Sequence, residues 1–120
     1  MIKARIRSFG FAANGILLML RTQPNAWIHA LATVLVFLLA WWLKVSPLEW
    51  IALILASLAV WVAEALNTAL EYLADATTRD FHPEIGKAKD VAAGAVLIAS
   101  IGAAAVGILV FFPYLAARFR

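Results

Sequence analysis

The sequence of 120 residues contains no cysteine, and only 14% of its residues are charged. Without cysteine, disulfides, thiolate metal sites and thiol nucleophiles are excluded. A soluble domain of this size carries about a quarter charged residues, because much of its surface faces water. Hydrophobic residues instead make up 65% of the chain, and the mean hydropathy is +0.91. A soluble globular monomer is therefore nearly excluded, and the composition indicates a membrane protein.

Three segments lack Asp, Glu, Lys and Arg: 22 residues from Thr22 to Leu43, 14 from Trp50 to Ala63 and 27 from Val91 to Ala117. An α-helix needs about 20 apolar residues to cross a bilayer. The first and third segments meet this requirement, and the second does so if its helix continues to about residue 73. The sequence predicts an all-α membrane protein with spans near 26–45, 48–74 and 90–115, in one domain covering 1–120.

The first 20 residues lack the small-residue cleavage site of a secretory signal. Their apolar side chains share one helical face, which predicts an amphipathic surface helix over about 2–21, with a helix packed on its neighbours as the alternative. Seven basic residues lie in the N-terminal arm and the 75–89 loop, against three on the other side. This places the N-terminus in the cytoplasm. The net charge of +3 sits at the edges of apolar runs, which suits lipid headgroups better than nucleic acid.

A polar stripe runs along the middle span, made of Glu64, Asn67, Glu71 and Asp75. At 100° per residue these four lie within about 80° of one another and extend about 17 Å. Carboxylates so close repel each other, and a divalent cation such as Mg²⁺ would relieve the repulsion. Glu64, the deepest, is the candidate general base. A structural helix–helix seam and a proton- or cation-coupled transporter using Glu64 are the alternatives.

A basic pair adds the opposite charge near the stripe. Lys87, Lys89 and Asp90 are expected at the start of the third span, where free backbone N–H groups favour anions. Lysines flanking a span are also ordinary topology signals. The sequence contains no GxxxxGK[ST] loop, HExxH or GxSxG motif. His29 and His82 are isolated, and His29 is expected to be an interfacial or packing residue.

The segments 64–75 and 87–96 resemble the bacterial integral-membrane diacylglycerol kinase family, which includes undecaprenol kinases. The similarity covers nearly the whole chain. It implies a homotrimer that uses ATP and Mg²⁺ to phosphorylate diacylglycerol or undecaprenol at the cytoplasmic face of the bacterial inner membrane. It further implies sites between subunits. The implied roles are catalytic base for Glu64, Mg²⁺ ligand for Glu71, and nucleotide contacts for Asn67, Asp75, Lys89, Asp90 and Gly15.

One position departs from the family pattern. Gln23 stands where the family usually has a glutamate that binds metal. A neutral amide oxygen still coordinates Mg²⁺ but brings no charge, so weaker metal binding, a compensating group or a shifted activity is expected, and loss of kinase activity stays open. The segments 25–29 and 111–113 are more similar to the undecaprenol kinase branch.

Overall fold

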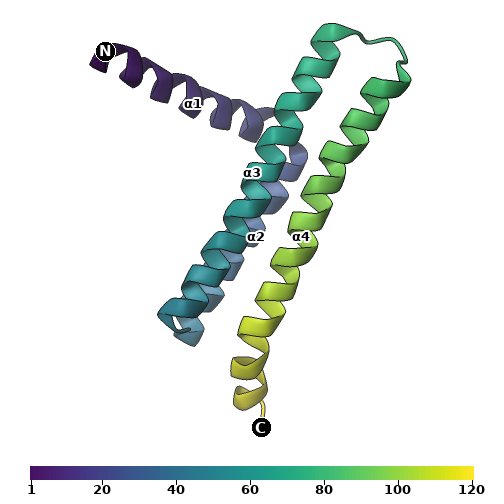
Figure 1. Cartoon of the computed structure of the whole chain (residues 1–120). Helices are drawn as coiled ribbons and strands as arrows, with labels where there is room; N and C mark the ends of the chain where they lie inside the picture. Colours follow the sequence, from purple (N-terminus) through teal and green to yellow (C-terminus); the bar gives the residue numbers. More distant parts are fainter.

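The computed structural model describes residues 1–120, and the chain forms helices joined by short connections, with no strand (Figure 1). Its four helices are α1 (Ile2–Thr22), α2 (Pro24–Leu43), α3 (Pro47–Thr77) and α4 (Pro83–Arg118). The last three are long and apolar enough to cross a membrane. The predicted fold class, one amphipathic helix followed by three candidate spans, is confirmed.

Helix α1 projects sideways from the other three helices (Figure 1). Met19 is its only buried residue, so α1 is not packed on its neighbours within one chain. Gln23 has extended backbone angles, and Pro24 then starts α2 with its φ already fixed. This break turns the chain from the direction of α1 into the bundle. An amphipathic helix held in this way is suited to lie along a membrane surface.

A tight turn joins α2 to α3. Lys44 adopts the left-handed conformation, which ends α2 at Leu43 rather than at residue 45 as predicted. Ser46 then caps α3: its hydroxyl accepts a hydrogen bond from Glu49 N, and its own N–H donates to Glu49 Oε2 at 2.8 Å. Trp41, Trp42 and Trp50 lie beside this turn, at what we call the tryptophan end of the bundle.

The connection between α3 and α4 is shorter than predicted, because only residues 78–82 are not helical. Pro83 starts α4 seven residues before the expected boundary at 90. The segment 86–90 therefore lies inside the helix, and its backbone N–H groups are not the free ones at the terminus. The expectation that these residues lie at the free N–H groups of the helix start is wrong. The side chains of Lys87, Lys89 and Asp90 instead project from the first two turns.

The two long helices extend past any bilayer core. With 31 and 36 residues, α3 and α4 are about 46 and 54 Å long, against about 30 Å of hydrocarbon. They run side by side (Figure 1), and most of the charged residues of these two helices lie in the part where they meet the 78–82 connection. We call this part, residues 71–90, the charged end. It places ionisable side chains from α3 and α4 together at one end of the bundle.

Packing within a single chain is sparse. Only 12 of the 120 residues are buried, so most of the apolar side chains must be covered by lipid or by other subunits. The main hydrophobic cluster lies at the tryptophan end and is made of six buried residues: Ala40, Leu43, Val45, Leu53, Val110 and Phe111. This cluster fixes the three spanning helices at one end. The polar stripe lies toward the other end.

A hydrogen bond across the tryptophan end gives a test of the helix arrangement. Tyr114 on α4 donates to Glu49 Oε2 on α3 at 2.6 Å. Tyr114→Phe removes this donor, so we expect the midpoint of thermal unfolding in detergent to fall by a few degrees. A double-mutant cycle with Glu49→Ala, followed by circular dichroism, isolates the pair. Strictly additive losses would contradict the contact.

Candidate functional site

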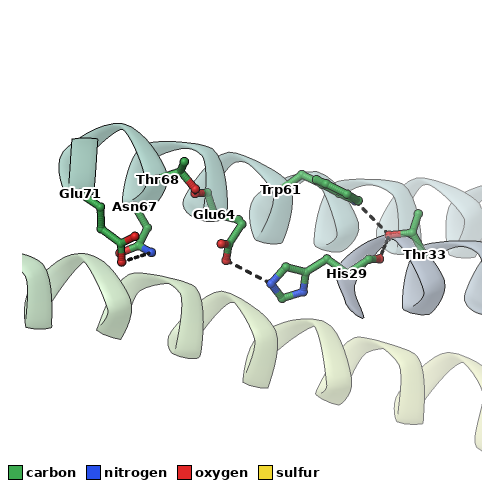
Figure 2. Close-up of polar contacts among 7 residues, drawn as sticks. All are labelled: His29, Thr33, Trp61, Glu64, Asn67, Thr68 and Glu71. Atoms are coloured by element: carbon green, nitrogen blue, oxygen red, sulfur yellow. Dashed lines mark hydrogen bonds and ion pairs between the residues drawn. The ribbon is translucent and has the colours of Figure 1, made fainter. Parts of the chain in front are cut away.

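Glu64 is the centre of the candidate site. Glu64 is only 1% exposed, although its side chain is ionisable and lies in the apolar part of α3. The nearest partner is His29 on α2, whose Nε2 lies 3.2 Å from Glu64 Oε2 (Figure 2). A buried carboxylate is costly unless it is paired or placed for chemistry. The structure therefore supplies one partner, from a helix that the sequence analysis did not connect to Glu64.

The next turn of α3 continues the polar stripe. Asn67 is buried, and its Nδ2 donates to Glu71 Oε1 at 3.5 Å, a long hydrogen bond. Thr68 donates its hydroxyl to the backbone carbonyl of Glu64 at 2.9 Å. Asn67 Oδ1 is buried and has no hydrogen-bond partner. An orphaned acceptor of this kind is unusual in a folded protein and is satisfied when a ligand supplies a donor or a cation.

The stripe faces the space between α3 and α4. Figure 2 shows Glu64, Asn67 and Glu71 on the side of α3 that faces α4, with His29 approaching from α2. A pocket of about 300 Å³ opens there. Its lining comes from all three spanning helices: Asn25, Ile28, His29, Glu64, Asn67, Ala93, Val96, Leu97 and Ser100. The pocket has a polar wall on α2 and α3 and a largely apolar wall on α4, which suits an amphiphilic ligand.

The charged end brings together two more of the predicted residues. Lys89 Nζ on α4 lies 3.4 Å from Asp75 Oδ1 on α3. Both line a second pocket, of about 370 Å³, beside the 78–82 loop. Asp90 is exposed and makes no side-chain hydrogen bond or ion pair, while Lys87 pairs with Glu84 at 3.0 Å on the open surface. The exposed Lys87 pair adds little stability. Lys89 is thus the basic residue closest to the stripe in this part of the chain.

Two predicted residues stay apart from the stripe within one chain. Gly15 lies on the exposed helix α1, and a Cβ built there would meet no atom within 4 Å. Gln23 is half-buried at the junction of α1 and α2, and its side chain makes no hydrogen bond. Its neighbour Thr22 does accept a hydrogen bond from Tyr72 at 3.2 Å, so this junction lies at the level of Glu71. A single chain therefore presents only part of the predicted nucleotide site.

The oxygen atoms of the polar stripe are the candidate ligands for Mg²⁺, which prefers hard oxygen donors. No group of three or more His, Cys, Asp or Glu side chains lies close enough to hold a metal ion within one chain. Mg²⁺ commonly uses only one or two protein carboxylates, with water and phosphate oxygens completing its shell. The Glu71 carboxylate and the unpartnered Asn67 Oδ1 are hard oxygen donors on adjacent turns. These residues fit a magnesium ion that arrives with a phosphate ligand.

His29 is the site residue that the sequence analysis missed. It was treated as isolated, but it contacts Glu64 across the α2–α3 pair. One signal could have found it. His29 and Glu64 lie at nearly equal distances along the chain from the turn at 44–46, so two antiparallel helices bring them to the same depth. Polar residues at one depth in membrane helices usually pair.

Fold and site together define a class: a helical membrane protein with a buried carboxylate and a charged end on two overlong helices. Comparison with known proteins identifies the family. The family described as prokaryotic diacylglycerol kinase matches residues 10–111. The chain belongs to this family and is a lipid kinase. Membership favours the kinase over the transporter that the buried glutamate also suggested.

Individual relatives agree with this assignment. The chain is 36% identical over 109 residues to an undecaprenol kinase of Bacillus subtilis, covering 91% of this chain and 89% of the relative. It is 40% identical over 107 residues to a diacylglycerol kinase of Synechocystis, covering 88% of this chain but 61% of that relative. A diacylglycerol kinase of Escherichia coli is 31% identical over 103 residues, covering 80% and 79%. With its three candidate spans, the chain is a bacterial membrane protein.

Proposed function

We propose that the protein transfers the γ-phosphoryl group of ATP to the hydroxyl of a membrane lipid alcohol, either diacylglycerol or undecaprenol. The reaction depends on Mg²⁺ and takes place at the cytoplasmic face of the inner membrane. The observation that carries the proposal is Glu64, a buried carboxylate in a pocket between α2, α3 and α4. Its depth suits a hydroxyl arriving from the lipid, while the charged end on the same helices suits a nucleotide arriving from water.

The roles follow from position along the stripe. Glu64, the deepest, accepts the proton of the lipid hydroxyl as general base. Asn67 lies one turn further toward the charged end and offers its unpartnered Oδ1 to the nucleotide and its metal ion. Glu71 and Gln23 hold the metal, which supplies positive charge against the phosphate oxygens. Lys89, Asp75, Asp90 and Gly15 contact the nucleotide, with Lys89 offsetting charge on the transferred phosphoryl group.

A homotrimer with its N-termini in the cytoplasm completes the proposal. One chain leaves Gly15 with no neighbour and most apolar side chains uncovered, so sites between subunits would satisfy both. The seven basic residues of the N-terminal arm and the 75–89 segment support the orientation. All of these parts belong to one membrane-embedded domain covering residues 1–120.

Phosphate transfer in mixed micelles tests the proposal. The purified protein receives ATP labelled at the γ-phosphate, Mg²⁺ and either diacylglycerol or undecaprenol, and the extracted lipid is counted. We expect label in at least one lipid and none when EDTA is present. Comparing the two alcohols at equal mole fraction identifies the preferred substrate. Absence of labelled lipid with both alcohols would contradict the proposed function, and Gln23→Glu would then test whether the missing carboxylate is the cause.

A further inference from the structure

His29 lines two pockets in the bundle. One is the 300 Å³ pocket that Glu64 also lines. The other is a larger and mostly hydrophobic pocket of about 580 Å³, lined by residues of all three spanning helices and extending to Phe111. The His29 side chain is 16% exposed, and its Nε2 lies 3.2 Å from Glu64 Oε2. His29 is thus the partner of the buried carboxylate and part of the lining of both pockets.

A second set of contacts holds His29 in place. Thr33, one turn along α2, donates its hydroxyl to the backbone carbonyl of His29 at 2.7 Å. The same hydroxyl oxygen accepts a hydrogen bond from Trp61 Nε1 on α3 at 3.0 Å (Figure 2). The Trp61 ring also meets the imidazole edge-on, with 6.3 Å between ring centroids. Trp61 therefore packs against the imidazole from α3, and its hydrogen bond to Thr33 ties it to the same turn of α2 that carries His29.

The contact leaves the two oxygens of Glu64 in different situations. Oε2 is bound by His29, whereas Oε1 accepts no hydrogen bond from the chain. An ionised carboxylate only accepts hydrogen bonds, so the contact requires a proton on Nε2. The terminal torsion of a glutamate side chain has a broad energy minimum and does not fix the carboxylate plane by itself. The imidazole supplies that restraint.

We propose that His29 is a positioning residue that fixes the Glu64 carboxylate through Oε2 and thereby aims Oε1 at the lipid hydroxyl. This inference rests on the proposed function. In the reaction the lipid O–H bond breaks and its proton goes to Glu64 Oε1, while the lipid oxygen bonds to the γ-phosphorus of ATP. The bond from that phosphorus to the bridging oxygen breaks, and ADP leaves with the electron pair. His29 keeps its Nε2 proton throughout.

Three substitutions of His29 test whether a hydrogen-bond donor that reaches Glu64 is what the site requires. His29→Gln places an amide N–H near the position of Nε2. His29→Met matches glutamine in length but has no donor, and His29→Asn keeps the amide but is too short to reach Glu64. We expect the Met and Asn variants to lower kcat by about 10- to 100-fold, because small errors in the position of a reacting group are costly. The KM for ATP and for lipid should stay within about twofold, and the Gln variant should retain most of the activity.

The kinetic result can overturn the proposal in two ways. Activity close to wild type in whichever of the Met and Asn variants folds would show that the restraint is not needed. Equal losses in the Gln, Met and Asn variants would show that the contact to Glu64 is not what matters. Val34→Ala, at an exposed position of α2, controls for general effects of substitution in this helix. Thermal unfolding in detergent checks that each variant is folded.

A spectroscopic measurement tests the contact without using kinase activity. The chain has two histidines, so ¹⁵N-histidine labelling gives ring signals from His29 and His82 only, and His29→Gln assigns them. Glu64→Gln should shift the Nε2 resonance of His29 and leave that of His82 unchanged. An unchanged His29 resonance would overturn the proposal. If the wild-type protein phosphorylates neither lipid, the proposed function fails, and this measurement still decides whether His29 binds Glu64.

Discussion

Glu64→Gln is expected to lower lipid phosphorylation by about 10²- to 10⁴-fold, the range attributed to a single general base. The amide has nearly the same shape as the carboxylate, and its oxygen still accepts a hydrogen bond from His29. It cannot accept a proton from the lipid hydroxyl. The fold and the binding of substrates should therefore persist while the chemical step is lost.

The rate of label transfer from γ-labelled ATP to lipid measures this effect, and Glu84→Gln is the matched control. Glu84 lies on the open surface and pairs only with Lys87, so its variant should behave as wild type. A structural seam made by the polar stripe predicts a different result, since an amide satisfies the same hydrogen bonds. Glu64→Gln with activity within about threefold of wild type would favour that structural reading and remove Glu64 from the chemistry.

Glu71→Gln should raise the Mg²⁺ concentration needed for half-maximal activity by at least about tenfold. Affinity for a hard cation depends strongly on the number of charged oxygen ligands. Glu71 is the only carboxylate in the proposed metal set, because position 23 is a glutamine. Its loss leaves neutral oxygens alone. Saturating Mg²⁺ should restore much of the rate, which distinguishes a metal ligand from a catalytic base.

Gln23→Glu is the converse experiment. It adds a negative charge at the junction of α1 and α2. This junction lies near Glu71, because the adjacent Thr22 contacts Tyr72, the residue that follows Glu71. The Mg²⁺ requirement should fall, and the double variant with Glu71→Gln should recover part of the lost affinity. Titration of activity with Mg²⁺ at fixed ATP gives both values. A Mg²⁺ requirement that neither substitution changes would place the metal elsewhere.

Much of the fold could be predicted from the distribution of charge. Segments without ionisable side chains correspond to α2, α3 and α4, because a bilayer core rejects charge. The distribution of charge did not predict the helix ends at residues 75–89, which were expected to form a loop. Charged residues end a span at the membrane surface, but they do not end a helix. Pro83 sets the start of α4, and the helix then continues through Lys87 and Lys89 before it enters the apolar region.

The site was predictable only where one helix determines it. The polar stripe follows from helical periodicity, and the structure places Glu64, Asn67 and Glu71 on the face toward α4 (Figure 2). The contact of His29 with Glu64 depends on how α2 and α3 are rotated against each other, which a projection of one helix does not contain. Gly15 and Gln23 do not reach the polar stripe within one chain. Their proposed roles therefore depend on how several chains assemble, which one sequence does not specify.

The most direct test of the account is to locate the lipid hydroxyl. A diacylglycerol analogue with a diazirine near the carboxyl end of one acyl chain, close to the glycerol and its free hydroxyl, is photolysed in membranes containing the protein, and the labelled peptides are mapped by mass spectrometry. We expect label on α3 around Glu64 or on the facing segment 93–100 of α4, reduced by excess unmodified lipid. Competed label concentrated at the tryptophan end, with none near Glu64, would contradict it.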